Sequence, residues 1–346
     1  MNCGVVLAFV LWLFPGGNAP LRPFQLQGYA QGTTYTITYY APDSVVATAE
    51  VRQQLAEIDA SLSLYQPNSL INQFNQSRRG VVADRHLRVV VGKALEVYQQ
   101  TDGLFDATVQ PLVQAWGFGT RPTETAPSPA AIQAILPAIG SDKLQWRGDS
   151  LVKRVAAVHL DLNGIAQGYT VDELAALLER KHIRNYLVEL GGEIRVRGRK
   201  WPSGQRLRIG IERPDTSSWQ LTAMQQIIEL DAGGVTTSGN YRKFKREGAV
   251  RNAHLIDPKS GYPFQNEMIS VTVVAPDAMT ADAYDNALMG MGVVKALTFL
   301  QKHRRLHAYL IYRRPNGTVA DTTSPKFPQL LSPHDPPSQT RLSQEN

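Results

Sequence analysis

Strand-like and helix-like segments follow one another in mixed order along this chain of 346 residues. Segments rich in β-branched and aromatic residues favour strands, and apolar residues repeating every three or four positions favour helices. The mixed order, with antiparallel-style alternation, predicts an α+β fold of mixed or antiparallel sheets flanked by helices. The expected strands are 33–40, 159–162, 186–190, 207–211, 227–230, 269–274 and 308–312, and the expected helices are about 44–61, 85–99, 166–180, 280–289 and 293–303.

The composition bounds the domain organisation. Hydrophobic residues make up 43% of the chain and charged residues 19%, which permits a large core in one domain or in two closely joined ones. We expect a folded region over residues 20–323 with no internal repeat. Residues 324–346 are rich in Pro, Ser and Gln and are expected to form a partly disordered tail.

The N-terminus carries an apolar run from Val5 to Phe14, which ends at Pro15. Its length of about ten residues is short for a membrane span and suits the central region of a signal peptide. The first positions lack Lys and Arg, so an uncleaved anchor or a buried strand or helix stays open. We expect residues 1–19 to be a signal peptide or anchor and the protein to be exported, to the periplasm or the periplasmic face of the inner membrane.

Charge and cysteine content exclude several classes of protein. Lys and Arg exceed Asp and Glu by 6, which suits a dinucleotide pyrophosphate but equally suits a protein with no anionic ligand. The sequence has no tract of five basic residues and no zinc-finger, RNA-binding or helix-turn-helix signature, so nucleic acid is not an expected partner. Cys3 is the only cysteine, which excludes a disulfide framework and a thiolate metal cluster.

Two stretches offer backbone and polar groups to a ligand. Residues 103–119 place Asp106 and Thr108 in an apolar run with three glycines, which would let backbone approach a planar ligand. Taken alone, the same stretch is better explained as a loop packed by its own aromatic residues, Phe105, Trp116 and Phe118. Residues 161–172 contain an expected strand end that turns into a helix, where free amide groups could bind phosphate, although a simple Asp or Asn cap would also explain the pattern.

A third stretch contains hydroxyls and a histidine. Three consecutive hydroxyl residues at 236–238 precede Gly239 and could bind phosphate or ribose. His254 and Asp257 lie three positions apart before a Pro/Gly turn. A histidine near phosphoryl chemistry can accept a proton, but an ordinary half-buried histidine fits the same spacing.

A fourth stretch, residues 280–289, combines acidic and apolar positions. On a helix, Asp282, Asp285 and Asn286 occupy positions i, i+3 and i+4, so their oxygens face one way. Such oxygens suit a hard cation such as Mg²⁺, which completes its shell with water and substrate phosphates. An exposed acidic helix face remains the alternative.

Together and in this order, these stretches resemble the ApbE family of FAD:protein FMN transferases. The resemblance runs from about Gln31 to about Gly292. It includes the segments 62–65, 103–119, 161–172, 188–192, 237–241, 254–258 and 281–285.

The resemblance implies a set of site residues. Positions matching the family's FAD contacts are Gln31, Tyr65, Leu104, Phe105, Asp106, Asp161, Gln167 and Ile256. Positions matching its Mg²⁺ ligands are Gly164, through its carbonyl oxygen, and Asp282, Asp285 and Asn286, and His254 matches the general base. Three positions depart from the usual pattern: Asn286 replaces Thr, Gln31 replaces the Met of some members, and Gln167 replaces Lys or Glu.

The resemblance also implies the reaction. A Ser or Thr hydroxyl of an acceptor protein, in a Ser/Thr-Gly-Ala-Thr-type motif of a respiratory or electron-transfer subunit, would attack the FMN-side phosphorus of FAD and release AMP with the help of Mg²⁺. Two alternatives stay open. A Mg²⁺-dependent FAD pyrophosphatase would use water at the same site, and a non-catalytic flavin-binding protein would have lost competence for the metal.

Overall fold

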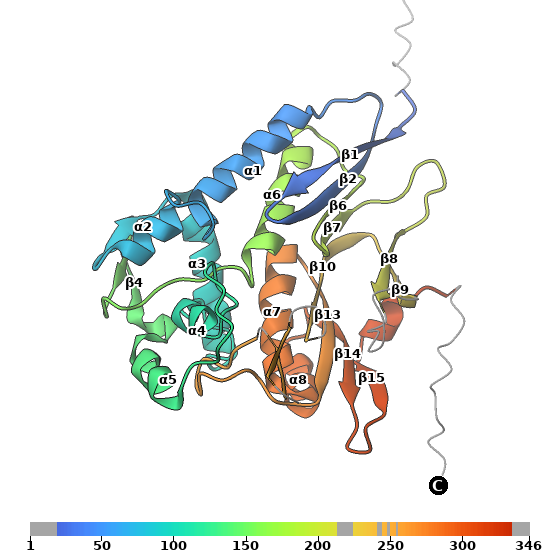
Figure 1. The fold of residues 1–346 in the computed structure, drawn as a ribbon. Helices are drawn as coiled ribbons and strands as arrows, with labels where there is room; N and C mark the ends of the chain where they lie inside the picture. The colour runs from blue at the N-terminus through green and yellow to red at the C-terminus, as the bar shows by residue number, and fades with distance from the viewer. Residues whose placement is uncertain (1–18, 213–223, 241–243, 248–249, 254, 334–346) are drawn as a thin grey trace, which may run out of the picture.

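A large antiparallel sheet forms the centre of the structure (Figure 1), a computed structural model that describes residues 19–212, 224–240, 244–247, 250–253 and 255–333. All neighbouring strands in this sheet run antiparallel. In spatial order its strands are β1 (Arg22–Ala30), β2 (Thr33–Ala41), β6 (Tyr186–Leu190), β7 (Glu193–Arg197), β10 (Ala232–Gly239), β13 (Met268–Ala275), β14 (His307–Arg313) and β15 (Val319–Thr323).

Helices cover one face of this sheet (Figure 1). Helix α6 packs on β6 and β7, α7 packs on β10 and β13, and the two helices contact each other. The described helices are α1 (Thr48–Leu62), α2 (Leu70–Gln76), α3 (Arg85–Gln100), α4 (Gln110–Ala115), α5 (Pro129–Ile135), α6 (Ala166–Arg180), α7 (Ala278–Met291) and α8 (Val293–Lys302), with short 3-10 turns η1 (Leu136–Ala138), η2 (Ser141–Lys143) and η3 (Phe327–Leu330). This arrangement confirms the α+β prediction.

Three smaller sheets complete the fold. One joins β3 (Gly80–Val82), β5 (Ser150–Lys153) and β4 (Leu144–Arg147), a second joins β8 (Leu207–Glu212) and β9 (Met224–Leu230), and a third joins β11 (Phe244–Glu247) and β12 (Val250–Ala253). Apolar residues of β8 and β9 pack against the sheet residues Val196, Val235 and Tyr309, together with Phe327 of η3. The central part of the sheet is therefore buried between helices on one side and the β8–β9 pair on the other.

Most expected elements occur where the sequence placed them. Helix α6 and strand β6 have the expected bounds, and the other expected elements are present with ends shifted by a few residues, with one exception. The strand expected at 159–162 is wrong. His159 makes a single bridge to Val109. The side-chain amide of Asn75 bonds both the N–H (2.7 Å) and the carbonyl (2.9 Å) of Leu160, replacing a strand partner.

Strand β10, which no periodic pattern indicated, lies at the centre of the sheet between β7 and β13. Its glycines explain both why the strand can lie close against α7 and why its sequence has no alternating apolar pattern. A Cβ atom at Gly234 would lie 2.2 Å from the Ala278 nitrogen, so the start of α7 approaches this strand more closely than a side chain allows. Close helix packing at this point brings α7 against the hydroxyl residues that follow Gly234.

The chain ends relate differently to this core. Residues 1–18, which include the expected apolar N-terminal run, lie outside the described residues. The first part of the expected tail packs against the core, because Phe327 is fully buried and the Ser332 hydroxyl donates to Glu229 at 2.8 Å. Within the described part of the chain, none of the helices has the length and apolar character needed to cross a membrane.

Candidate active site

One cavity of about 440 Å³ collects the residues that the sequence singled out from six separate parts of the chain. Its walls include the β1–β2 turn, the loop after α1, the loop before α4, the start of α6, the segment around Ile256 and the middle of α7. Of the candidate residues, those lining it are Gln31, Tyr65, Leu104, Phe105, Asp106, Asp161, Gly164, Gln167, Ile256, Asp282, Asp285 and Asn286. His254 lies outside the described residues, and the next residue, Leu255, lines the cavity.

Gln31 reaches the cavity because of the turn that carries it. Gln31 and Gly32 both have positive φ angles, 52° and 77°, as in the two-residue turns that match the twist of a hairpin. The Gln31 amide nitrogen donates to Asp59 and to Thr170, each at 3.0 Å. These bonds tie the edge hairpin to α1 and α6 and hold the Gln31 side chain at the cavity wall.

Asp106 anchors the loop at residues 103–108. Its carboxylate accepts bonds from the Thr108 N–H (2.8 Å), the Thr108 hydroxyl (2.7 Å) and the Ser141 hydroxyl (2.7 Å). Burial nevertheless raises the pKa of Asp106, the hydrogen bonds opposing this effect. Within the chain, Asp106 therefore holds this loop in a fixed shape at the cavity.

The start of α6 meets the middle of α7 at the cavity. The Gly168 N–H donates to Asp282 at 2.9 Å, so the carboxylate takes one of the free amides of the α6 N-terminus. Asp161, just before this helix, accepts a bond from the Asn163 N–H (2.9 Å), and burial raises its pKa. The expected phosphate-binding helix start is thus occupied in part by an acidic residue of α7.

Asp282 and Asp285 lie fully inside the protein on the cavity side of α7. Burial raises the pKa of Asp282 well above its usual value, and the charge of Glu193 adds to this. Burial also raises the pKa of Asp285, and its neighbour Asp282 raises it further. Two buried acids so close to each other need a cation, or a proton, to compensate their charge.

Asn286 follows directly on the same helix. Its amide nitrogen donates to the Asp282 carbonyl (2.9 Å) and to the Gly164 carbonyl (3.3 Å). Its amide oxygen faces the Ser238 hydroxyl at 3.5 Å. The structure therefore brings Gly164, just before α6, into contact with Asn286 of α7, as one shared site would require.

These oxygen donors fit a magnesium ion. Oxygen Oδ1 of Asp285 is buried and makes no protein hydrogen bond of ordinary geometry, so it has lone pairs left for a cation. Among the described residues, no group of three or more His, Cys, Asp or Glu side chains is placed to enclose a metal. A site with two carboxylates suits Mg²⁺, which keeps several waters or substrate oxygens in its shell.

Some cavity residues were not singled out by the sequence. Glu193, at the start of β7, lines the cavity, and its negative charge helps to raise the pKa of both buried aspartates. It directly follows the segment 188–192 that carries part of the family resemblance, which is the signal that could have identified it. Asp59 on α1 also lines the cavity, and burial raises its pKa. No pattern in the sequence marks Asp59 as a site residue; its hydrogen bond with Gln31 in the structure identifies it.

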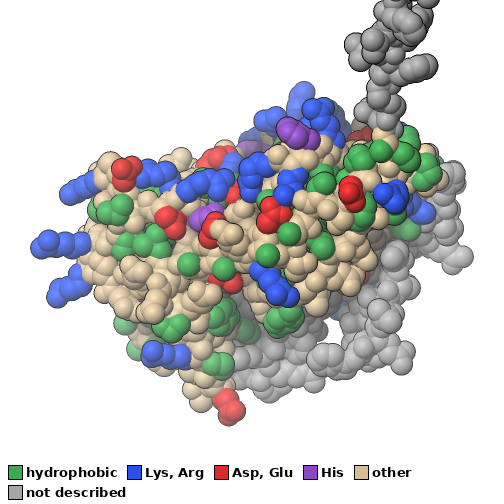
Figure 2. Space-filling view, turned by 90° about the horizontal axis from the view of Figure 1, so that it is seen from above, with side chains coloured by type: hydrophobic (Ala, Val, Ile, Leu, Met, Phe, Trp, Pro, Cys, Tyr) green, Lys and Arg blue, Asp and Glu red, His purple; other side chains and the backbone are tan. Residues whose placement is uncertain are grey.

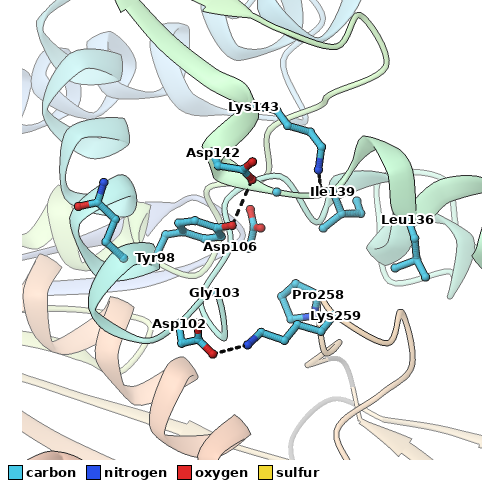
Figure 3. A pocket seen from close by; sticks show the side chains of 12 residues that line it. Tyr98, Asp102, Gly103, Asp106, Leu136, Ile139, Asp142, Lys143, Pro258 and Lys259 are labelled. Carbon is cyan, nitrogen blue, oxygen red and sulfur yellow. Dashed lines mark hydrogen bonds and ion pairs between the residues drawn. The ribbon is translucent and has the colours of Figure 1, made fainter.

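A neighbouring cavity of about 410 Å³ shares Asp106 and Pro258 with the candidate active site (Figure 3). Its charged groups are paired within the protein. Lys259 bonds Asp102 at 2.6 Å, and the Tyr98 hydroxyl donates to Asp142 at 3.2 Å. The Lys259–Asp102 ion pair also links the turn after Ile256 to the loop that precedes Asp106, although a surface pair of this kind contributes little stability.

The turn after Ile256 has a stronger anchor than this ion pair. The buried indole nitrogen of Trp116 donates to the Gly261 carbonyl at 2.8 Å. The Asp257 N–H donates to the Tyr262 carbonyl, also at 2.8 Å, which closes the turn. The segment that follows His254 is therefore fixed relative to the loop at residues 103–119.

The positive charge of the chain is spread over its surface. Figure 2 shows Lys and Arg side chains interspersed with Asp and Glu on the face seen from above. The excess of 6 positive charges is thus not gathered into one patch on this face. The acidic residues of the cavity, in contrast, lie close together.

Comparisons with known proteins agree with one another. A family model described as "ApbE family" matches residues 31–310. A relative from Haemophilus influenzae named "FAD:protein FMN transferase" is 36% identical over 317 residues, covering 88% of this chain and 90% of the relative.

Solved structures are similar as well. "Flavin Transferase ApbE from Vibrio cholerae" superposes with a TM-score of 0.81 at 32% identity, covering 90% of this chain and 100% of that one. The apo form of the Pseudomonas stutzeri flavinyl transferase ApbE superposes with a TM-score of 0.80 at 33% identity, covering 92% of this chain and 98% of that one.

Proposed function

The chain belongs to the ApbE family, and we propose that it is an FAD:protein FMN transferase that attaches the FMN part of FAD to a Ser or Thr hydroxyl of an acceptor protein. One observation carries the proposal. The candidate FAD positions and the buried pair Asp282 and Asp285 line one cavity, although they come from distant parts of the sequence. The extent of the similarity to proteins named for this activity supports it.

The proposed reaction exchanges one phosphorus–oxygen bond for another. The acceptor oxygen forms a bond to the FMN-side phosphorus of FAD, and the bond from that phosphorus to the bridging oxygen breaks. The bridging oxygen leaves with AMP, and the hydroxyl proton passes to a base. The protein must therefore bind the pyrophosphate, offset its charge and receive a proton.

The residues of the cavity suit these tasks. We propose that Asp282 and Asp285, with the Gly164 carbonyl and Asn286, hold Mg²⁺ in the cavity. When bound, the ion would offset the charge that develops on the pyrophosphate. The buried position of both carboxylates supports this assignment, since a cation would compensate their charge.

FAD contacts are assigned by the same reasoning. Gln31, Phe105 and Gln167 line the cavity on three different elements and could hold the flavin and its phosphates. Tyr65 is 70% exposed at the cavity edge, where its ring is free to stack on a planar ligand. His254 is proposed as the base, since it precedes Leu255 and Ile256, which both line the cavity.

One incubation separates this function from its alternatives. The purified protein is mixed with FAD, Mg²⁺ and a soluble carrier domain that displays a Ser-Gly-Ala-Thr segment. Fluorescent flavin on the carrier, resistant to denaturation, together with one AMP per flavin, is the expected result. Free FMN and AMP without labelling would instead indicate a pyrophosphatase, and unchanged FAD a flavin-binding protein.

We further propose that the protein acts outside the cytoplasm, on a respiratory or electron-transfer subunit. The apolar run at 5–14 and the similarity to the family support this. Mass spectrometry of the protein from a bacterial host should find the N-terminus removed near residue 19, or the full chain in the membrane fraction. Full-length protein in the cytoplasm would contradict the proposal.

A further inference from the structure

A second groove, of about 720 Å³, adjoins the candidate active site. One wall is the segment 257–267, and the other is the junction of α7 and α8, residues 290–295; both are orange in Figure 1. We refer to it as the α7–α8 groove. Phe264 lines both the groove and the active-site cavity, so the two spaces share one side chain as their common wall.

Both walls continue the chain from residues of the proposed active site. The segment 257–267 follows His254 after two residues, and residues 290–295 follow Asn286 on α7. Gly290 is four residues beyond Asn286, which corresponds to roughly 6 Å along the helix axis. The end of the groove at Phe264 and Gly290 therefore lies next to the proposed site of phosphoryl transfer.

The surface of the groove combines exposed apolar side chains with charge. Val294 is 76% exposed and Tyr262 is 39% exposed, and Met291 belongs to the same wall as Val294. Glu267 and Lys295 flank these residues. Apolar anchors within a polar rim are typical of surfaces that recognise polypeptides.

Hydrogen bonds hold the walls in a fixed shape. The Asn266 amide nitrogen donates to the Met289 carbonyl at 2.8 Å, and Glu267 accepts a bond from the Val293 N–H at 2.8 Å. A Cβ atom on Gly290 would lie 2.5 Å from the Phe264 ring, so this glycine lets the ring pack directly on α7. A preformed groove binds a flexible chain at a lower entropic cost than a mobile one.

The proposed reaction has a macromolecular substrate as well as FAD. A polypeptide cannot share the cavity fully with a dinucleotide, so it needs surface next to that cavity. The cavity of Figure 3 is less suited, because its Lys259 and Asp102 are paired with each other and its Asp142 accepts a bond from Tyr98. We propose that the α7–α8 groove binds the acceptor segment that carries the hydroxyl. This assignment rests on the transferase function proposed above.

The test changes one exposed groove residue and a matched residue elsewhere. Val294→Glu places a charge on the apolar surface of the groove. Val82→Glu makes the same substitution at a residue that is 68% exposed on β3, which contributes to neither wall. Labelling rates of the Ser-Gly-Ala-Thr carrier domain are measured against its concentration, and the Kd for FAD is measured by flavin fluorescence.

Val294→Glu should raise KM for the carrier about tenfold or more while kcat stays within about threefold of the wild-type value, because binding and not chemistry is weakened. The Kd for FAD should not change, and Val82→Glu should match the wild type. Unchanged KM in Val294→Glu would overturn the groove assignment and leave the transferase function intact. Absence of labelling by the wild-type protein would refute that function and the groove assignment with it.

Cross-linking provides a second measurement. Cys3 is the only cysteine, so Val294→Cys in a Cys3→Ser background carries one thiol for a photoreactive label. The label should cross-link the carrier domain at this position and not at Val82→Cys. Equal cross-linking at the two positions would contradict specific binding in the groove.

Discussion

Substitution of Gly168 by Ala should damage both the fold and the metal site, because α6 and α7 meet at this residue. A Cβ atom there would lie 2.4 Å from the Ala278 carbonyl oxygen and 2.8 Å from the Asp282 Cβ. The first of these contacts is with backbone and cannot be relieved by rotating a side chain. The Gly168 N–H also donates to the Asp282 carboxylate at 2.9 Å.

The structure gives the size of the effect. To restore an ordinary contact of about 3.4 Å, the helices must separate by about 1 Å at this point. Overpacking of this kind costs about 1–3 kcal/mol. A shift of this size also weakens the bond to Asp282, and bonds to charged groups contribute about 1.5–3 kcal/mol. We expect the free energy of unfolding to fall by about 2–4 kcal/mol and the Mg²⁺ concentration for half-maximal labelling to rise about tenfold.

The assay combines urea denaturation with a Mg²⁺ titration of the labelling rate. Gly92→Ala is the matched control, because Gly92 lies inside α3 and a Cβ there would meet nothing within 4 Å. That variant should gain about 0.5–1 kcal/mol from helix propensity and keep its metal dependence. Wild-type stability and metal dependence in Gly168→Ala would refute the close contact of α6 with α7.

Three further predictions concern single side chains. Asp282→Asn should nearly abolish Mg²⁺-dependent labelling, whereas Asn286→Thr should shift the half-maximal Mg²⁺ concentration only a few-fold; equal effects of both in a Mg²⁺ titration would contradict the assignment. His254→Ala should slow labelling by roughly a hundredfold while the Kd for FAD, measured by calorimetry, changes only a few-fold, and an unchanged rate would remove His254 from the reaction. Burial raises the pKa of Asp172 from 3.8 to about 6. The carboxyl therefore stabilises the fold fully at pH values below its unfolded pKa, and this contribution is lost as the pH rises through about 6. The free energy of unfolding of Asp172→Asn should therefore rise relative to wild type by up to about 3 kcal/mol from about pH 4 to about pH 7 in denaturation curves, and a constant difference would contradict the raised pKa.

Elements whose burial follows one regular period were predictable from the sequence. Helix α3 buries Leu87, Val91 and Ala94 at helical spacing, and β2 buries Tyr35 and Ile37 at strand spacing. Here a single face meets the core, so the local pattern carries the information. The same local patterns predicted the α+β class.

Elements defined by close packing were not predictable in this way. Apart from Val235, strand β10 consists of small and hydroxyl residues, and α7 approaches it closely at Gly234. The strand expected at 159–162 was wrong because Asn75, far away in the sequence, bonds both polar backbone groups of Leu160. Neither contact leaves a periodic signal in the local sequence.

For the candidate site too, local spacing predicted one part of the arrangement, and contacts between distant elements determine the rest. Spacing on a helix put Asp282, Asp285 and Asn286 on one side of α7, and the structure has all three in one cavity. Spacing could not indicate that Glu193 would lie near both aspartates or that Gly168 would bond Asp282, because these residues are on other elements. Only the packing of α6, α7 and β7 against one another makes the cavity acidic enough to favour a cation.

Asn286 illustrates what geometry adds to the family resemblance. Its amide nitrogen donates to the carbonyls of Gly164 and Asp282, while its oxygen faces Ser238. A threonine has no amide group with which to hold both carbonyls. In this orientation the Asn286 amide nitrogen also positions the Gly164 oxygen, which keeps a second lone pair for an ion. The assignment of Asn286 as a direct ligand stays a prediction. A positioning role predicts that Asn286→Asp, which also lacks the amide, weakens Mg²⁺ binding despite its added negative charge; a gain in Mg²⁺ affinity in calorimetry would favour direct ligation.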